Sequence, residues 1–185
     1  MNKMVTLLGK YDLIDHESYD KAHQIIEEVS PDVIFSGLTP ELGKKTLSIF
    51  SLEEPLDFSK IPESWHEKAS DLIKKLPGTV SAYQDLLPGD SAAIRYAITE
   101  KVPIKFIGNP GRARELSRIV YEGNSLDFEK YNFEYLKDQL SSNTHSNPLI
   151  VLSAEELEIN NPHTLSYKLH SEGFEVHRKI VEVLA

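Results

Sequence analysis

The sequence predicts an α/β domain of three layers, with a mainly parallel sheet of about five strands and helices on both faces. Short apolar runs rich in β-branched residues recur along the chain, and segments with helical periodicity separate them. The first two runs flank a single helical segment, an order that favours a parallel βαβ unit with a right-handed crossover. A chain of 185 residues can bury a full core, so we expect one domain over residues 1–185.

Five strands are expected from apolar runs bounded by glycine, proline or polar residues. They are Met4 to Gly9, Val33 to Gly37, Val102 to Ile107, Pro148 to Ser153 and Phe174 to Ile180. The first and fourth runs stop at a small residue, and a carboxylate (Asp12 or Glu156) follows three positions later. In parallel sheets the carboxyl edge of the strands is where ligands bind, so these strand ends mark the expected site.

Helices are expected where apolar residues recur at helical spacing between capping and breaking residues. Pro40 is typical of a first helical position, and Gly173 is typical of the residue after a helix end. The expected helices span Asp15 to Val29, Pro40 onward, Ser64 to Leu76, Pro88 onward, Asn109 to Val120, Leu126 to Leu140, and Asn161 to Gly173.

Composition excludes several classes of protein. A net charge of -9 argues against nonspecific nucleic-acid binding, which needs clustered Lys and Arg. The absence of cysteine removes disulfides, thiolate metal sites and cysteine nucleophiles. The N-terminal apolar run is too short for a signal peptide, and no run approaches the length of a membrane span. We therefore expect a cytoplasmic protein without a membrane segment.

The order of several motifs resembles the TraB/pheromone-shutdown family, which includes Tiki-like proteases and is distantly related to ChaN-like and erythromycin-esterase-like proteins. The resemblance rests on Gly9-Lys10-Tyr11-Asp12, on residues 31–42 beginning Pro31-Asp32-Val33, on residues 89–97 and 102–110, and on the layout of residues 149–176. That family opens with a strand ending in Gly-x-x-His, continues with Pro-Asp-Val-Val-x-x-Glu-Leu-x-x-x-Arg, and carries a second Gly-x-x-His. The resemblance implies an α/β fold and a site at the strand ends.

The functional positions of the family are replaced in this chain. Asp12 stands in place of the first histidine, Gly37 of the glutamate, Leu42 of the arginine, Ser153 and Glu156 of the second glycine and histidine, and Gly108-Asn109 of a later Asp-Arg pair. The resemblance therefore implies a retained scaffold with altered or lost chemistry. The leading hypothesis is a noncatalytic protein with a binding or regulatory role, a pseudoenzyme.

An alternative hypothesis is a remodelled enzyme, a metal-assisted hydrolase in which Asp12 and Glu156 act as catalytic residues and metal ligands. Carboxylate oxygens suit Mg²⁺, Mn²⁺ or Ca²⁺ better than Zn²⁺. This site requires the first and fourth strands to be neighbours, and the opposing interpretation is that both carboxylates cap adjacent helices or lie solvated in loops.

A third hypothesis places an anion or nucleotide at the strand-to-helix junction of residues 108–114, with Asn109, Arg112 and Arg114 as ligand-binding residues. Its alternative is a capped turn without a ligand. His163 is added as a ligand-binding candidate because it lies just beyond the second family motif. The aromatic segment from Leu126 to Leu140 is a candidate contact surface for a homodimer; the partners are otherwise unassigned.

Overall fold

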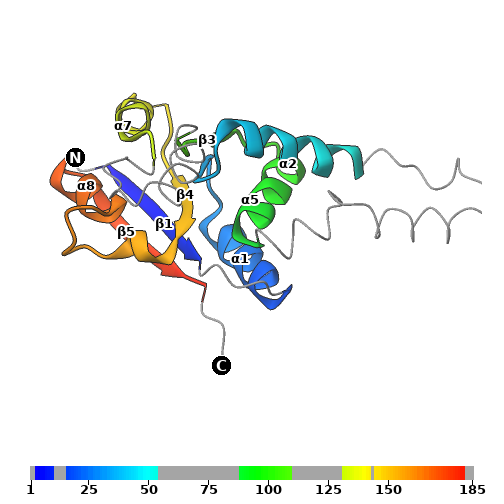
Figure 1. Cartoon of the computed structure of the whole chain (residues 1–185), viewed down its shortest axis with the longest axis horizontal. Coiled ribbons are helices and arrows are strands. Elements are labelled where there is room, and N and C mark those ends of the chain that lie inside the picture. The colour runs from blue at the N-terminus through cyan, green and yellow to red at the C-terminus, as the bar shows by residue number, and fades with distance from the viewer. Residues whose placement is uncertain (1–2, 11–15, 54–87, 110–130, 143, 182–185) are drawn as a thin grey trace, which may run out of the picture.

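The computed structural model describes residues 3–10, 16–53, 88–109, 131–142 and 144–181. Five strands in this part of the chain form one parallel sheet with the order β3-β2-β4-β1-β5 (Figure 1). The strands are β1 (Met4–Lys10), β2 (Val33–Ser36), β3 (Ile104–Phe106), β4 (Pro148–Ser153) and β5 (Glu175–Ile180). The predicted parallel α/β sheet is therefore confirmed.

The pairing register brings the carboxyl ends of β1 and β4 together. Strand β4 lies between β1 and β2, and Lys10 is opposite Ser153. On the other side of β1, Gly9 is opposite Ile180 of β5. The prediction that distant strand ends meet at one edge is confirmed, because residues 10 and 153 are direct neighbours.

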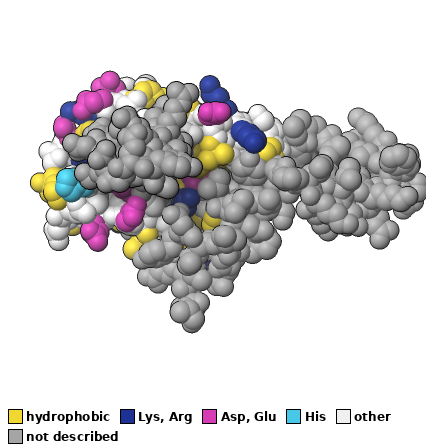
Figure 2. All heavy atoms as spheres, in the orientation of Figure 1, with side chains coloured by type: hydrophobic (Ala, Val, Ile, Leu, Met, Phe, Trp, Pro, Cys, Tyr) yellow, Lys and Arg dark blue, Asp and Glu magenta, His cyan; other side chains and the backbone are white. Residues whose placement is uncertain are grey.

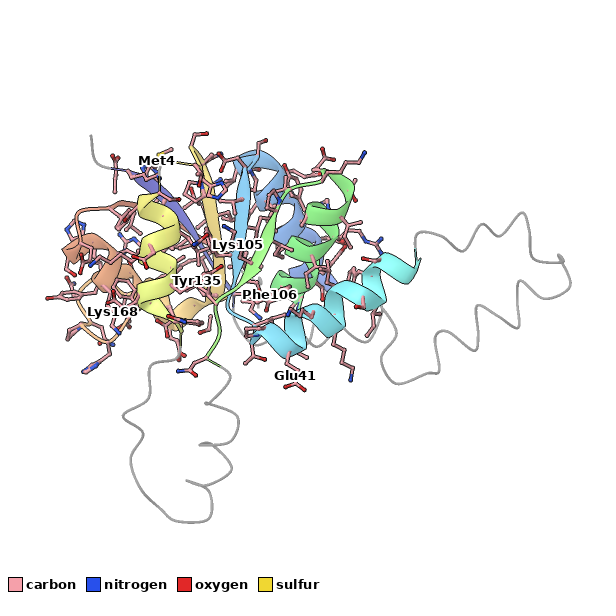
Figure 3. All side chains as sticks on the ribbon, turned by 90° about the horizontal axis from the view of Figure 1, so that it is seen from above. Met4, Glu41, Lys105, Phe106, Tyr135 and Lys168 are labelled. Atoms are coloured by element: carbon pink, nitrogen blue, oxygen red, sulfur yellow. The ribbon has the colours of Figure 1, made fainter. Side chains whose placement is uncertain are left out.

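Helices cover both faces of the sheet. On one face lie α1 (His16–Val29) and α5 (Pro88–Thr99), with α2 (Pro40–Glu53) packed beside α5 and β3. On the other face lie α7 (Phe133–Ser141) and α8 (Leu165–Ser171) (Figures 1 and 3). Phe106 of β3 lies against α2 at Gly43, which shows how closely this helix approaches the edge of the sheet (Figure 3).

The core follows the alternation of side chains along buried strands. Val5, Leu7, Val33, Phe35, Ile150 and Leu152 face α7 and α8, while Leu8, Ile34, Leu149 and Val151 face α1 and α5. All ten are at most 1% exposed, so the three inner strands β2, β4 and β1 are buried on both faces, as expected of a parallel sheet covered by helices, whereas the edge strands β3 and β5 are half-buried or exposed. Full burial of one such side chain contributes about 1.5–3 kcal/mol, and the sheet is stabilised from both layers.

Three predicted elements start two or more residues later than expected. The strand predicted from Val102 begins at Ile104, because the Val102 amide donates instead to the carbonyl of Ala97 at the end of α5. The helix predicted from Leu126 begins at Phe133, because Asn132 caps it and Tyr131 pairs with Gly108 in a β-bridge.

The helix predicted from Asn161 begins at Leu165, because the hydroxyl of Thr164 accepts a hydrogen bond from the Tyr167 amide and caps the first turn. Its predicted terminating glycine is confirmed, since Gly173 follows the C-cap with φ +84°. The helices predicted over Ser64 to Leu76 and through Val120 lie outside the described residues.

The aromatic segment is mostly core. Tyr131 and Phe133 are buried, whereas Tyr135 of α7 is 38% exposed and points outward (Figure 3). Phe128 lies outside the described residues. The contact surface predicted over Leu126 to Leu140 is therefore reduced, within the described residues, to the outer side of α7.

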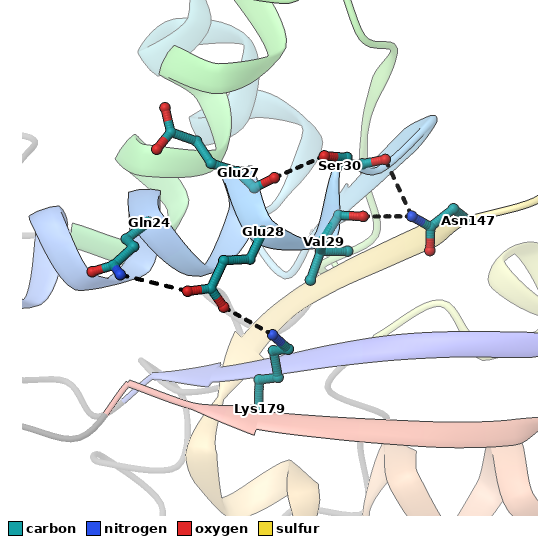
Figure 4. Close-up of polar contacts among 7 residues, drawn as sticks. All are labelled: Gln24, Glu27, Glu28, Val29, Ser30, Asn147 and Lys179. Atoms are coloured by element: carbon teal, nitrogen blue, oxygen red, sulfur yellow. Dashed lines mark hydrogen bonds and ion pairs between the residues drawn. The ribbon is translucent and has the colours of Figure 1, made fainter.

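Polar contacts tie the end of α1 to the start of β4 at the amino edge of the sheet. The side-chain Nδ2 of Asn147 donates to the carbonyls of Val29, at 2.6 Å, and Ser30, at 3.1 Å (Figure 4). Lys179 of β5 pairs with Glu28 at 3.2 Å (Figure 4). The connection that enters β4 is thus fixed by the helix that crosses from β1 to β2.

Asp32 completes this connection from the other side. Its carboxylate accepts hydrogen bonds from the Ser146 amide, at 2.5 Å, the Ser146 hydroxyl, at 2.9 Å, and the Asn147 amide, at 3.1 Å. Partial burial raises the pKa of Asp32, but the hydrogen bonds lower it by more. The pKa of Asp32 therefore lies below its ordinary value of 3.8. Asp32 belongs to the Pro-Asp-Val motif of the resemblance, and its role at this position is structural.

Replacing Asp32 with Asn should weaken the protein near neutral pH and make it less sensitive to acid. A carboxyl whose folded pKa is lowered stabilises the fold above its unfolded pKa, and this contribution is lost as the pH falls through the folded value. We expect a loss of about 1 kcal/mol at pH 7, because the half-buried carboxylate is partly screened by water. Denaturant unfolding at pH 7, 5 and 3 checks this: the gap between wild type and variant should shrink towards pH 3, and a constant gap would contradict the assignment.

Candidate functional site

A buried ionic network joins three elements at the carboxyl edge of the sheet. Asp90, in the first turn of α5, is 1% exposed. Its Oδ2 pairs with Lys10 Nζ at the end of β1 at 2.5 Å, and its Oδ1 accepts from Ser36 Oγ at the end of β2 at 2.8 Å. Ser36 Oγ also accepts from the Leu38 amide at 3.2 Å. This Lys10–Asp90–Ser36 network fixes α5 to two strand ends and compensates the buried charge.

Glu156 lies in the short 3₁₀ helix η2 (Ala154–Leu157), which directly follows β4. It is 7% exposed, and its Oε2 accepts a hydrogen bond from the Leu165 amide at the start of α8 at 2.9 Å. A carboxylate at this position satisfies an unpaired helix amide and interacts favourably with the helix dipole. The geometry of Glu156 therefore matches the capping interpretation, while Asp12 lies outside the described residues.

Tyr131 fills the space above the end of β2. It is 7% exposed, and its pKa is raised far above 10, chiefly by burial and then by the negative charge of Glu156. Hydrogen bonding with Ser153 opposes this shift without cancelling it. The phenol consequently stays protonated, and Tyr131 acts as a neutral packing and hydrogen-bonding group at this edge.

Two of the positions that differ from the family motifs have no room for a side chain. A Cβ at Gly37 would lie 2.9 Å from the Tyr131 ring. A Cβ at Gly108 would lie 2.4 Å from the carbonyl oxygen of Gly37. Carboxylates at these positions would therefore displace Tyr131 or the backbone, so the two glycines and Tyr131 form one packed unit.

A cavity of about 690 Å³ lies at the same edge, next to η2. The described residues that line it are Lys10, Ser153, Ala154, Glu155, Leu157, Glu158, Arg178 and Ile180. They come from the ends of β1, β4 and β5 and from the η2 segment. This volume is in the range of small-molecule sites, and it lies where parallel sheets bind their ligands.

Close packing of η2 on β1 shapes one wall of this cavity. Leu157 is 5% exposed and lies directly over Gly9, where a Cβ would come within 2.5 Å of Leu157 Cδ1. Arg178 Nη1 donates to the Leu157 carbonyl at 3.3 Å, which joins η2 to β5. Packing against Gly9 of β1 and the hydrogen bond from Arg178 of β5 thus both hold η2 in place.

The other predicted site residues lie elsewhere or outside the described chain. Asn109 is half-buried and follows Gly108 beyond the end of β3, whereas Arg112 and Arg114 are not among the described residues. His163 is exposed, its amide donates to Asn161 Oδ1 at 3.0 Å, and it is not among the residues that line the cavity. Within the described ranges, no group of three or more His, Asp or Glu is arranged to hold a metal ion.

Sequence reasoning missed the Lys10–Asp90–Ser36 network and the role of Arg178. A weak signal was present, because Ser36 and Lys10 are polar residues at the ends of apolar runs and Asp90 lies in a predicted first helical turn. Only the three-dimensional arrangement brings residues 10, 36 and 90 together.

The fold and this edge define an α/β protein of three layers with a charged cavity beside the carboxyl ends of its parallel strands. Figure 2 shows acidic, basic and apolar side chains interspersed over the described part of one face, without a field of a single sign. None of the helices in the described ranges is long and apolar enough to cross a membrane. Comparison of the chain with family models, characterised proteins and solved structures found no match.

Proposed function

We propose that this protein is a noncatalytic TraB-like domain that binds a small ligand in the cavity beside η2. The observation that supports this most is how the polar groups at the carboxyl edge are used. Both carboxylate oxygens of Asp90 are bonded inside the protein, and a Glu156 oxygen accepts from a helix amide. These charged groups are used to hold helices α5 and α8 at the carboxyl edge of the sheet. The cavity beside η2 lies at the same edge.

Catalysis would need a reactive group within reach of the ligand and with a suitable pKa. The hydroxyl of Ser36 is fully buried and donates to Asp90, a carboxylate already paired with Lys10. The pKa of Tyr131 is raised by burial, which disfavours a role as a base. The packing around Gly37 and Gly108 also supports the loss of the family's chemistry, because acidic side chains do not fit there.

A compound screen with a cavity-filling variant tests the proposal. We expect some small polar compounds to raise the melting temperature of the wild type, because a ligand at about 100 times its Kd stabilises the folded state by about 2.7 kcal/mol. Ala154 lines the cavity, so Ala154→Leu should reduce this stabilisation. Ser171→Leu, on the exposed end of α8, is the matched control and should keep it. The proposal would be overturned if no compound gave a rise in melting temperature that Ala154→Leu reduces.

Metal and phosphate titrations on the same instrument separate the alternatives. Mg²⁺, Mn²⁺ and Ca²⁺ should leave the melting temperature unchanged in wild type and in the Asp12→Asn/Glu156→Gln variant. A metal-dependent rise that disappears in the double variant would instead support the metal-assisted hydrolase. Stabilisation by inorganic phosphate that is lost in Arg112→Gln would support an anion site in residues 108–114.

A further inference from the structure

We propose that the ligand of this cavity is a small zwitterion, between a free amino acid and a dipeptide in size, with one carboxylate and one ammonium group. This inference rests on the proposed function, since it names the class of ligand for the same cavity. It is carried by opposite charges that different elements bring to the lining of one cavity and by the apolar residues that line it with them.

The two signs of charge come from different elements. Arg178 projects from β5, whereas Glu155 lies in η2 and Glu158 immediately after it. Lys10 also lines the cavity, but its charge is balanced by Asp90 at 2.5 Å. Glu155 Oε1 already accepts a hydrogen bond from Ser153 Oγ at 3.3 Å. Arg178 is therefore the cation best placed to meet a ligand carboxylate, and Glu158 is the carboxylate best placed to meet an ammonium group.

The geometry of Arg178 suits this role. Its Nη1 donates to the Leu157 carbonyl at 3.3 Å, which orients the guanidinium beside the cavity wall. A guanidinium presents five N–H donors in a planar fork that matches the two oxygens of a carboxylate. The side chain is exposed, so a ligand can reach it without displacing a buried residue.

Arg178 and Glu158 line the same cavity without forming an ion pair with each other in the described part of the chain. A ligand with only one charge would pair with one of these groups and cover the other, which would lose hydration without gaining a charged partner, and this costs free energy. A zwitterion supplies a partner for both groups at once. The charge pattern therefore favours a zwitterion over a simple anion or a simple amine.

Apolar surface in the cavity favours a ligand with a hydrocarbon body. Ile180 is 41% exposed at the end of β5, and Leu157 of η2 also lines the cavity. Covering exposed apolar surface contributes about 25 cal/mol per Å². The cavity volume of about 690 Å³ accommodates a dipeptide more completely than a single amino acid.

Calorimetric titration with leucylleucine and its two capped forms tests the inference on the full-length protein. The C-terminal amide lacks the carboxylate, and the N-acetyl derivative lacks the ammonium group, while the apolar body is unchanged. Each cap should weaken binding about tenfold or more, because each removes a hydrogen bond to a charged partner. Equal affinity for the free and capped dipeptides would overturn the zwitterion, as would no binding of leucylleucine.

Variants of Arg178 and Glu158 assign each protein group to its partner on the ligand. Arg178→Gln should weaken binding of free leucylleucine about tenfold but leave the affinity for its C-terminal amide unchanged. Glu158→Gln should weaken binding of free leucylleucine but leave the affinity for the N-acetyl form unchanged. Lys179→Gln removes the same charge from the neighbouring position of β5 and should change nothing. If the capped forms bind as well as leucylleucine and remain sensitive to Ala154→Leu, the zwitterion fails while the binding function stands.

Discussion

Replacing Gly108 with alanine is expected to lower the free energy of unfolding by about 3 kcal/mol, the upper range for forced overpacking. The added Cβ would lie 2.4 Å from the Gly37 carbonyl oxygen and 2.6 Å from the Leu38 carbonyl carbon. These neighbours are backbone atoms that cannot rotate away, and the Gly108 amide itself donates to the Leu38 carbonyl. Denaturant unfolding at pH 7 measures the loss.

Gly43→Ala is the matched comparison for this effect. Its Cβ would approach the Phe106 ring to 2.2 Å, a closer contact than at Gly108, but the neighbour is a half-buried side chain that can move. The helix also gains about 1 kcal/mol from replacing glycine by alanine, which offsets part of the cost. We expect Gly43→Ala to be clearly milder than Gly108→Ala, and the reverse order would contradict the backbone explanation.

Removing the carboxylate of Asp90 should have the second large effect. Asp90→Ala removes the carboxylate that pairs with the ammonium group of Lys10, on a side chain only 11% exposed, and takes the acceptor away from Ser36. Breaking a buried pair from one side costs about 3–5 kcal/mol, and partial exposure of Lys10 places the expected loss near about 3 kcal/mol. Chemical denaturation of wild type and variant at pH 7 gives this value.

The double variant Lys10→Met/Asp90→Leu separates a lost attraction from an unpaired charge. Apolar replacement of both partners removes the buried charge altogether, so the double variant should be more stable than Asp90→Ala alone. Ser36 is still left without its acceptor, which keeps the recovery incomplete. If the double variant is no more stable than Asp90→Ala, the pair does not act as a compensated buried charge.

Much of the fold follows from local patterns that the sequence displays. Strand β4 has the predicted bounds Pro148 and Ser153, because a run of apolar residues between proline and serine leaves little freedom. The adjacency of β1 and β4 was required by the hypothesis of a shared edge, and the register of Lys10 with Ser153 confirms it. Helix starts were less predictable, since capping by Asn132 and Thr164 competes with earlier candidates in the sequence.

The candidate site was harder to predict than the strands that carry it. Its charged groups are far apart in sequence: Arg178 meets η2 only because β5 lies beside β1, and Asp90 meets Lys10 only because α5 begins over the strand edge. A sequence gives residue types at each strand end but not the order of strands within the sheet. Glu156 was recognised as a residue of this edge, and its bond to the Leu165 amide was one of the two roles considered for it.

The strand order also has a consequence for how the protein is made. Both neighbours of β1 are supplied by residues 148–180, so β1 leaves the ribosome long before either of its sides can be paired. Such long-range pairing slows folding and prolongs the exposure of an apolar segment during synthesis. Nascent chains that end before Pro148 should therefore depend on chaperones to keep β1 from aggregating.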